Sequence, residues 1–294
     1  MREIVLVSAL SFTLAACGAT TPELDLSSEG GAEAIVGGVS YAGLPAVGAL
    51  FRNGAPFCTG TLVGPRKVLT AAHCLQGVTA SQLQFRIGAN AFSPAHIVSV
   101  SRIKSHPDFD MESITNDIGL VTLRTDAPAT PLKLLAEMDE SWVGTPMFIV
   151  GYGVTSSHSY AGAGKKRAVT IPVTDIGATK FEYQAPGKSA CNGDSGGPAL
   201  YHDPNGTFLV AGVTSYGDAD CEAYGVDTRT DVYASFVGAP TALPSDPCRG
   251  ETFKGRCAQG LLIWCDDQEV KTEDCAAEGA TCGWQAGAGY YNCL

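Results

Sequence analysis

Three short segments of the chain carry the residue types of nucleophilic catalysis, in the order His, Asp, Ser. His73 lies in TAAHC, Asp117 in NDIGL and Ser195 in GDSGGP. A serine hydroxyl is a poor nucleophile at neutral pH unless a base takes its proton. An imidazole with a pKa of about 6.5 does so when a carboxylate holds its tautomer and stabilises the cation. Together the segments predict a serine that is activated as a nucleophile.

Each segment has a simpler interpretation when it is taken alone. A single histidine is usually structural, Asn-Asp is common in turns, and a Gly-rich stretch can be a flexible loop. The order of the three segments and their flanking residues favour catalysis. The other histidines lack such flanks, and we expect no catalytic role for His96, His106, His158 and His202.

With IVGG at residues 35–38, these segments resemble the chymotrypsin/trypsin family of serine endopeptidases over about residues 35–238. The roles are carried over from the family's known triad: the resemblance implies that His73 is general base and then acid, Asp117 orients it, and Ser195 attacks the scissile carbonyl. It also implies an oxyanion hole made by the Gly193 and Ser195 amides. The alternative is an inactive relative that keeps the fold and serves as a binding protein.

The resemblance further implies a zymogen. IVGG matches the family's activation site, where a cut before Ile35 frees an α-amine that pairs with Asp194. A buried carboxylate needs such a partner. Because Cys17 is the only cysteine before Ile35, we expect that cutting the Ala34–Ile35 bond also releases the protease from any anchor on Cys17. The activating protease is not identified by the sequence.

The resemblance implies a substrate-binding set made of Ser189, Ser215, Gly217, Gly225 and Asp227. Ser189 falls at the pocket floor, where a carboxylate would select Arg or Lys, and Gly217 and Gly225 fall at the walls. We therefore expect an open pocket that prefers large apolar P1 residues such as Phe, Tyr, Leu or Met. Asp227 stands where the family usually has Tyr, so a trypsin-like preference through Asp227 is the alternative. The other possibility is that neighbouring amides hold Asp227 away from the substrate.

By the same resemblance, Cys58 pairs with Cys74 and Cys191 with Cys221. The stretch 75–107 contains no Asp or Glu, which removes the ligands of a calcium loop. We expect no metal and no cofactor.

The elements that must position these residues are strands. From Ile35 to about residue 243, short β-branched and apolar runs alternate with Gly, Pro, Asn and Asp clusters, which predicts an all-β domain. The resemblance narrows this to two packed six-stranded antiparallel β-barrels with the triad between them, and a short helix around residues 231–237.

A second module is expected at residues 244–294. A Pro-rich linker near 240–247 precedes six cysteines in under fifty residues, and no His or Cys-x-x-Cys pair accompanies them, so disulfides are favoured over zinc. Six cysteines allow 15 connectivities. A rival hypothesis makes this module the main function, as an adhesion or substrate-docking domain that the protease serves. Its cysteines are Cys248, Cys257, Cys265, Cys275, Cys282 and Cys293.

The N-terminal residues predict export. Residues 1–16 read as a signal peptide and end in LAAC, which resembles the bacterial lipobox, so Cys17 is expected to carry lipid. The alternative is an ordinary cleaved signal. Residues 17–34 hold four acids and no base, as expected of a propeptide or tether. The expected location is the bacterial cell envelope before activation and the extracellular space after it.

The composition limits the partners. The 294 residues carry a formal net charge of −11, and phosphate binding needs clustered basic residues, so we expect protein or peptide substrates and no nucleic acid. Membrane contact is expected only through the lipid on Cys17. The one dense basic run, KKR at 165–167, is expected to be a solvated loop, with a processing nick as the alternative.

Overall fold

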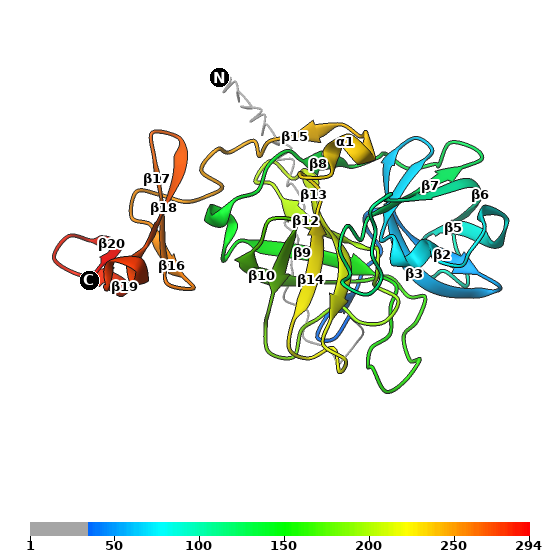
Figure 1. Ribbon diagram of the computed structural model, residues 1–294, viewed down its shortest axis with the longest axis horizontal. Coiled ribbons are helices and arrows are strands. Elements are labelled where there is room, and N and C mark those ends of the chain that lie inside the picture. Colours follow the sequence, from blue (N-terminus) through cyan, green and yellow to red (C-terminus); the bar gives the residue numbers. More distant parts are fainter. Residues whose placement is uncertain (1–34) are drawn as a thin grey trace, which may run out of the picture. The chain divides into compact units, whose positions relative to one another are not determined.

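The computed structural model of the chain describes residues 35–294. The expected signal peptide (1–16), the acidic segment (17–34) and the lipid acceptor Cys17 lie outside the described residues. β-Strands dominate the described chain (Figure 1). Within residues 35–294, no helix is long and apolar enough to cross a bilayer.

The first part of the described chain forms a closed barrel of six antiparallel strands in the order β2-β3-β4-β7-β6-β5. In β5, Leu83, Phe85 and Ile87 are buried while the residues between them are half-buried. This is the period-two pattern of a strand with one face in a core. The strands are β2 (Val47–Arg52), β3 (Ala55–Gly64), β4 (Lys67–Thr70), β5 (Leu83–Ile87), β6 (His96–Ser105) and β7 (Gly119–Leu123).

A second ring of six antiparallel strands runs β9-β10-β11-β14-β13-β12 and closes where β12 pairs with β9. The first core cluster extends into this barrel through Phe148, Val150 and Leu200, so the barrels share buried side chains. The all-β class with two six-stranded barrels is thus confirmed. The strands are β9 (Pro146–Gly151), β10 (Arg167–Ile176), β11 (Lys180–Tyr183), β12 (Pro198–His202), β13 (Phe208–Gly217) and β14 (Gly225–Arg229).

Short elements extend the barrels. Strand β1 (Val39–Ser40) pairs with β10, β8 (Lys133–Leu135) runs parallel to β13, and β15 (Thr241–Ala242) runs parallel to β8. The Pro-rich segment expected as a linker therefore contains a strand. Helix α1 (Ala234–Val237) ends at Gly238, whose φ is 56°, and 3₁₀ turns η1 (His73–Leu75), η2 (Ala80–Gln82) and η3 (Glu140–Trp142) complete the barrels.

Residues beyond 244 form small sheets joined by three disulfides. Their pairing is Cys248–Cys265, Cys257–Cys282 and Cys275–Cys293, one of the fifteen possible connectivities. Few apolar side chains are buried here, Leu262 and Ile263 among them, so the disulfides replace a large core. The elements are β16 (Arg256–Ala258), β17 (Leu261–Asp266), β18 (Glu269–Asp274), η4 (Cys275–Glu278), β19 (Cys282–Gln285) and β20 (Tyr290–Cys293).

The expectation for the KKR run is wrong for two of its three residues. Lys166 is 2% exposed and Arg167 is 4% exposed. The Lys166 ammonium donates to the carbonyls of Gly43 and Leu44 at 2.9 Å each, and burial lowers its pKa to about 8. These hydrogen bonds explain how a cation is accommodated without a solvated loop.

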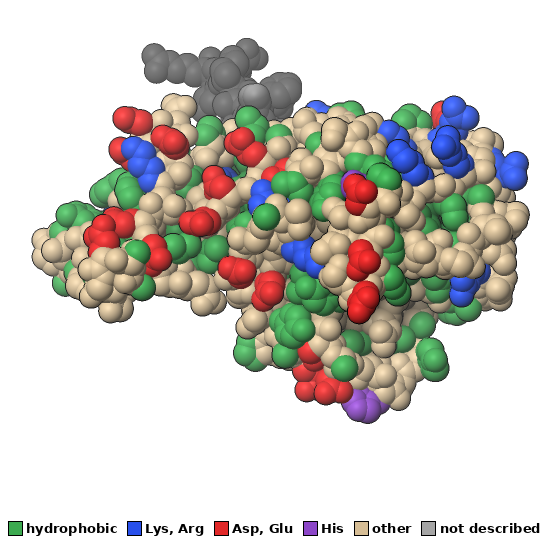
Figure 2. Space-filling model, viewed as in Figure 1, with side chains coloured by type: hydrophobic (Ala, Val, Ile, Leu, Met, Phe, Trp, Pro, Cys, Tyr) green, Lys and Arg blue, Asp and Glu red, His purple; other side chains and the backbone are tan. Residues whose placement is uncertain are grey.

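Exposed basic residues gather instead on the outside of the first barrel, although they are not consecutive in the sequence. On the face in Figure 2, most Lys and Arg side chains lie over that barrel. Strand pairing collects residues that are far apart in sequence, as at Thr122, which pairs with both Lys67 and Arg102. Arg66, Arg102, Lys104 and Arg124 are exposed members of this group.

Candidate active site

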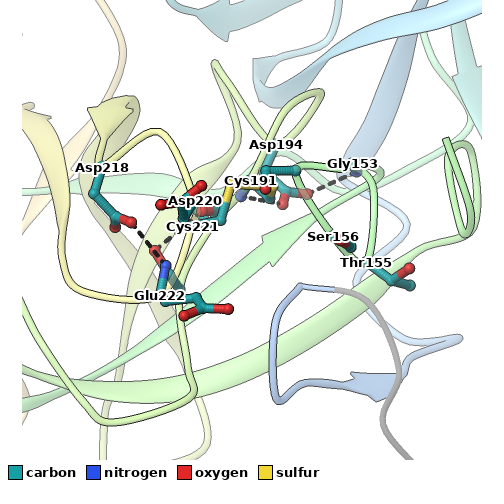
Figure 3. Close-up of a disulfide and its surroundings, with 12 residues drawn as sticks. Gly153, Thr155, Ser156, Cys191, Asp194, Asp218, Asp220, Cys221 and Glu222 are labelled. Carbon is teal, nitrogen blue, oxygen red and sulfur yellow. Dashed lines mark hydrogen bonds between the residues drawn. A yellow bond between two sulfur atoms is a disulfide. The ribbon is translucent and has the colours of Figure 1, made fainter. Parts of the chain in front are cut away.

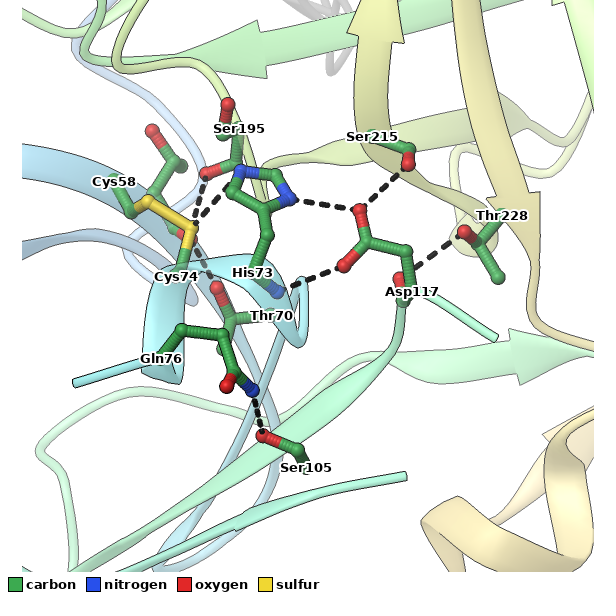
Figure 4. A network of polar contacts seen from close by, with 11 residues as sticks. Cys58, Thr70, His73, Cys74, Gln76, Ser105, Asp117, Ser195, Ser215 and Thr228 are labelled. Atoms are coloured by element: carbon green, nitrogen blue, oxygen red, sulfur yellow. Dashed lines mark hydrogen bonds and ion pairs between the residues drawn. A yellow bond between two sulfur atoms is a disulfide. The ribbon is translucent and has the colours of Figure 1, made fainter. Parts of the chain in front are cut away.

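His73 begins the 3₁₀ turn η1, three residues after strand β4 ends. Its backbone N–H donates to Asp117 Oδ1 at 2.9 Å, and its Nδ1 lies 2.7 Å from Asp117 Oδ2 (Figure 4). An ionised carboxylate only accepts hydrogen bonds, so Nδ1 carries the proton. The neutral imidazole then has Nε2 as its proton acceptor.

Asp117 is buried, with 0% exposure, and lies two residues before strand β7 begins. Asn116 before it adopts φ 52°, a left-handed conformation that Asn tolerates better than most residues. Ser215 Oγ donates to Asp117 Oδ2 at 2.6 Å, and Thr228 Oγ1 donates to the Asp117 carbonyl at 3.0 Å. Burial raises the pKa of Asp117, but the His73 hydrogen bond and charge, with the Ser215 hydrogen bond, outweigh it and hold the pKa below its usual value. Asp117 is therefore anionic at neutral pH.

Ser195 lies in the turn between β11 and β12. Its carbonyl accepts the Thr59 N–H at 2.9 Å. The next residue, Gly196, has φ 79°, and a Cβ there would lie 2.5 Å from the Thr59 carbonyl oxygen, so only glycine fits this close approach. Figure 4 places Ser195 beside the His73 ring. In the described part of the chain, the Ser195 hydroxyl and His73 Nε2 form no hydrogen bond. In many enzymes this hydrogen bond forms only when substrate binds.

The amides of Gly193 and Ser195 are available for a ligand. In the described part of the chain, neither N–H donates to another backbone group, whereas the Asp194 N–H between them donates to the Cys191 carbonyl at 2.9 Å. Gly193 has φ 97°, and its carbonyl accepts from Thr59 Oγ1 at 2.9 Å. Two free neighbouring donors beside a serine are the arrangement that stabilises an oxyanion.

Asp194 is buried beside this turn. Its Oδ1 accepts the Gly153 N–H at 2.7 Å and its Oδ2 accepts the Cys191 N–H at 2.9 Å (Figure 3). Burial raises its pKa to about 6, although the two backbone hydrogen bonds and the Arg167 charge oppose the increase. The carboxyl therefore lies in a site where a further cation would stabilise its ionised form.

Ile35 and the residues after it dock on the second barrel. The Ile35 side chain is 1% exposed and belongs to that barrel's core cluster. Ser189 N donates to the Val36 carbonyl at 3.2 Å, and Val36 packs against the cluster formed by Val154, Cys191 and Cys221. The segment after the expected cut thus contacts the same Cys191 region that holds Asp194.

A cavity of about 230 Å³ opens beside Ser195. The Cys191–Cys221 disulfide lines it, and a second disulfide joins Cys58 to Cys74 near His73, in the pairs that the resemblance implied. The lining residues are Ala190, Cys191, Asn192, Ser195, Thr214, Ser215, Tyr216, Gly217, Asp218, Ala219 and Cys221.

Of the five expected substrate-binding residues, Ser215 and Gly217 line this cavity, while Ser189, Gly225 and Asp227 do not. Ser189 is buried, and its hydroxyl donates to the Ala190 carbonyl at 3.0 Å. Asp227 has 0% exposure. Three of the residues expected to shape the P1 pocket therefore lie outside the lining of this cavity, and the P1 preference stays a prediction.

Sequence reasoning missed Asp218 at the cavity rim. Its carboxylate accepts the Glu222 N–H at 3.0 Å and the Ala223 N–H at 2.9 Å, and Figure 3 shows Asp218, Asp220 and Glu222 grouped around Cys221. Burial is the largest single influence and raises the pKa of Asp218, but the backbone hydrogen bonds together outweigh it and lower that pKa. Thr59 was also missed, because no local motif marks a threonine that acts across the barrel interface.

The described residues contain one cluster of metal-ligating atom types, Cys58, His73 and Cys74. Both sulfurs belong to one disulfide. A disulfide offers no thiolate, so this cluster is not a metal site.

Comparison with known proteins agrees with this geometry. A family model described as Trypsin matches residues 35–237. Trypsin Blo t 3 of Blomia tropicalis is 32% identical over 206 residues, which cover 62% of this chain and 76% of that protein. Trypsin beta of Drosophila erecta is 31% identical over 236 residues, 74% of this chain and 89% of that protein. Serine protease 56 of Mus musculus is 32% identical over 209 residues, 63% of this chain and 34% of that protein. The chain therefore belongs to the trypsin family of serine endopeptidases.

Proposed function

We propose that the protein hydrolyses internal peptide bonds of protein or peptide substrates through His73, Asp117 and Ser195. The observation that carries the proposal is the pair of hydrogen bonds between His73 and Asp117, at 2.9 and 2.7 Å, beside a serine whose own amide and the Gly193 amide are free. The hydrogen bonds fix the base and its tautomer. The two amides provide donors where negative charge develops.

The reaction follows from these positions. Ser195 Oγ attacks the scissile carbonyl carbon as its proton passes to His73 Nε2, and Asp117 stabilises the resulting imidazolium. The Gly193 and Ser195 amides donate hydrogen bonds to the oxyanion. Collapse of the tetrahedral intermediate breaks the C–N bond, and His73 gives its proton to the leaving amine. Water then attacks the acyl-enzyme with His73 again as base, which releases the acid product and restores Ser195.

The protein is made as a zymogen that a cut before Ile35 activates. The new α-amine pairs with Asp194 and fixes the turn that carries Gly193 and Ser195. Two observations support this step: Ile35 is buried in the second barrel, and Val36 contacts the cluster of Cys191, whose N–H donates to Asp194. An ammonium there would offset the cost of the buried carboxylate.

The enzyme is exported, and lipid on Cys17 anchors it before activation. Five disulfides among the described residues fit an oxidising compartment. Cleavage before Ile35 separates the protease from Cys17 and releases it. An active enzyme that still carried the lipidated peptide on the same chain would refute the release.

The P1 residue is uncharged. The carboxylates of Asp218, Asp220 and Glu222 near the cavity rim disfavour an acidic P1 side chain. Asp227 does not line the cavity, which argues against the alternative of a basic P1 preference through that residue. The original expectation of a large apolar P1 residue stays a prediction.

A fluorophosphonate probe, which labels only an activated serine, tests the function. The chain beginning at Ile35 should be labelled, while the chain that keeps residues 18–34 and the Ser195→Ala variant should not. A folded Ile35 form that stays unlabelled would favour the inactive binding protein. Equal labelling of both chain lengths would retain the peptidase and refute the zymogen.

A further inference from the structure

A buried tyrosine lies next to the strand pair that borders the cavity beside Ser195. Tyr183, the last residue of β11, pairs directly with Gly225 at the start of β14. The Tyr183 side chain has 0% exposure. It occupies the space into which a Gly225 Cβ would point, because such an atom would overlap the tyrosine ring and hydroxyl.

Gly225 in turn pairs with Gly217, which lines the cavity. The two glycines leave the strands β13 and β14 without side chains at this point. The Tyr183 ring fills the space that Gly225 leaves, whereas a Cβ on Gly217 would meet the Tyr224 carbonyl. Ser189, the residue expected at the floor, turns its hydroxyl to the Ala190 carbonyl and takes no part in the lining.

Asp227 is buried next to this tyrosine. Its carboxyl faces the hydroxyls of Tyr183 and Thr214, but neither contact reaches the geometry of a full hydrogen bond, and both carboxyl oxygens lack a protein partner of good geometry. The Tyr183 hydroxyl is likewise buried without such a partner. Burial foremost, followed by the charges of Asp227 and Asp194, raises the pKa of Tyr183 well above its usual value. A carboxyl and a phenol are thus buried together behind strands β13 and β14.

We infer that Tyr183 is the floor of the P1 pocket, that it restricts P1 to small uncharged side chains such as Ala and Val, and that it screens Asp227 from the substrate. The inference rests on the proposed peptidase function and deepens it by naming the substrate class. It is an alternative to the expected large apolar P1 residue, because the Tyr183 ring would fill the depth that Phe or Tyr needs.

The first test needs no variant. The chain beginning at Ile35 is assayed on peptide anilides that differ only at P1, with Ala, Val, Phe and Arg. We expect kcat/KM for Ala or Val to exceed that for Phe and Arg by about tenfold or more. A higher kcat/KM for Phe or Arg than for Ala overturns the inference. Absence of both hydrolysis and fluorophosphonate labelling would instead refute the peptidase, and the inference with it.

Variants separate the two roles of Tyr183. Tyr183→Ala should raise kcat/KM for Phe by about tenfold and also create cleavage after Arg, because Asp227 becomes accessible. Adding Asp227→Asn should keep the gain for Phe and abolish the gain for Arg. Tyr183→Phe, which keeps the ring, should keep the wild-type order of P1 residues. Tyr160→Ala is a matched control, since Tyr160 is 93% exposed and lines no part of the cavity.

Labelling by the probe shows which variants are folded and active, because it does not depend on P1. If Tyr183→Ala is labelled but shows no rise in kcat/KM for Phe, Tyr183 is not the floor of the P1 pocket. If kcat/KM rises for Phe but not for Arg, Tyr183 does not screen Asp227 from the substrate. If Tyr183→Ala fails to fold, Tyr183→Leu, which fills less of the space, is measured in its place with the same expected direction.

Discussion

Thr59 of the first barrel holds Gly193 of the second, with its Oγ1 donating to the Gly193 carbonyl at 2.9 Å. The Thr59 N–H also donates to the Ser195 carbonyl at 2.9 Å, and Thr59 has 0% exposure. The carbonyls on both sides of the catalytic turn are therefore bound by one residue. Because each peptide group is planar, these two contacts orient the peptide groups that follow Gly193 and Ser195. The Gly193 and Ser195 amides belong to the preceding peptide groups, so Thr59 constrains them through the φ and ψ angles of the two residues.

Thr59→Val should weaken the oxyanion hole without filling or emptying the core. The change removes the hydroxyl but keeps the shape, so the buried Gly193 carbonyl loses its partner, a loss of about 1–3 kcal/mol. We expect kcat to fall about ten- to hundredfold with little change in KM. Thr59→Ser retains the hydroxyl and should stay close to wild type. A Thr59→Val variant with the kcat of the wild type would show that the turn carrying Gly193 and Ser195 keeps its geometry without the Thr59 hydroxyl.

The residues that sequence could identify are those with a local motif. His73, Asp117 and Ser195 each lie in a distinctive segment, and the all-β class follows from short apolar runs between turn residues. Thr59 and Tyr183 could not be found this way, because each acts through a partner distant in the chain. Tyr183 matters only because β11 pairs with β14 in a register that sets it opposite Gly225.

The prediction that Lys166 lies in a solvated loop was wrong for the same reason. Its neighbours in sequence are basic and its loop is Gly-rich, which predicts solvent. Its actual partners are carbonyls more than 120 residues away, at Gly43 and Leu44. The pairing of the last six cysteines likewise depends on how β16–β20 fold and not on their spacing.

Cutting the Ala34–Ile35 bond should stabilise the protease through Asp194. In a Ser195→Ala background, which prevents self-digestion, the chain beginning at Ile35 should have a higher Tm than the chain beginning at Gly18. An α-amine paired with a buried carboxylate has a raised pKa, so the extra stability is fully present below its unfolded value of about 7.7–8.0. The extra stability is then lost as the pH rises through the folded value.

Asp194→Asn should remove the difference in Tm between the two chain lengths, because it removes the carboxylate that the amine pairs with. Asp218→Asn is the matched control, since Asp218 is satisfied by backbone amides at the cavity rim, and it should preserve the difference. Equal Tm values for the two chain lengths in the Ser195→Ala background would contradict the pairing.

Asp227 should make the protein less stable as the pH rises. Burial raises its pKa from 3.8 to about 8, although the Tyr183 and Thr214 hydroxyls oppose the increase. Between these two pKa values, Asp227 keeps its proton in the folded state but loses it in the unfolded chain. The free energy of unfolding therefore falls with pH, by about 1.4 kcal/mol per unit for one proton.

Urea unfolding of Asp227→Asn tests this slope. Relative to wild type, the variant should gain stability progressively from pH 4 to pH 8, because asparagine has no proton to lose. The exposed Asp175→Asn should run parallel to wild type. A constant difference between Asp227→Asn and wild type over this range would show that Asp227 does not titrate within the window.

Arg249 should couple the C-terminal residues to the second barrel. Its guanidinium lies 4.3 Å from the centre of the Trp142 ring and donates to the Ser141 carbonyl at 3.0 Å and to the Ser141 Oγ at 2.6 Å. Burial lowers the pKa of Arg249, with Asp139 the largest opposing influence. Such a desolvated cation over an indole, with two hydrogen bonds, contributes roughly 1–3 kcal/mol.

Arg249→Ala should therefore lower the free energy of unfolding by that amount, measured by denaturant titration with all disulfides intact, while kcat/KM on short peptides stays unchanged. Arg249→Lys keeps the charge but loses the planar group that stacks on Trp142, so it should recover only part of the loss. Lys254→Ala, an exposed cation in the same segment, is the control. If Arg249→Ala were as stable as Lys254→Ala, the contact would contribute no stability and would not couple the C-terminal residues to the second barrel.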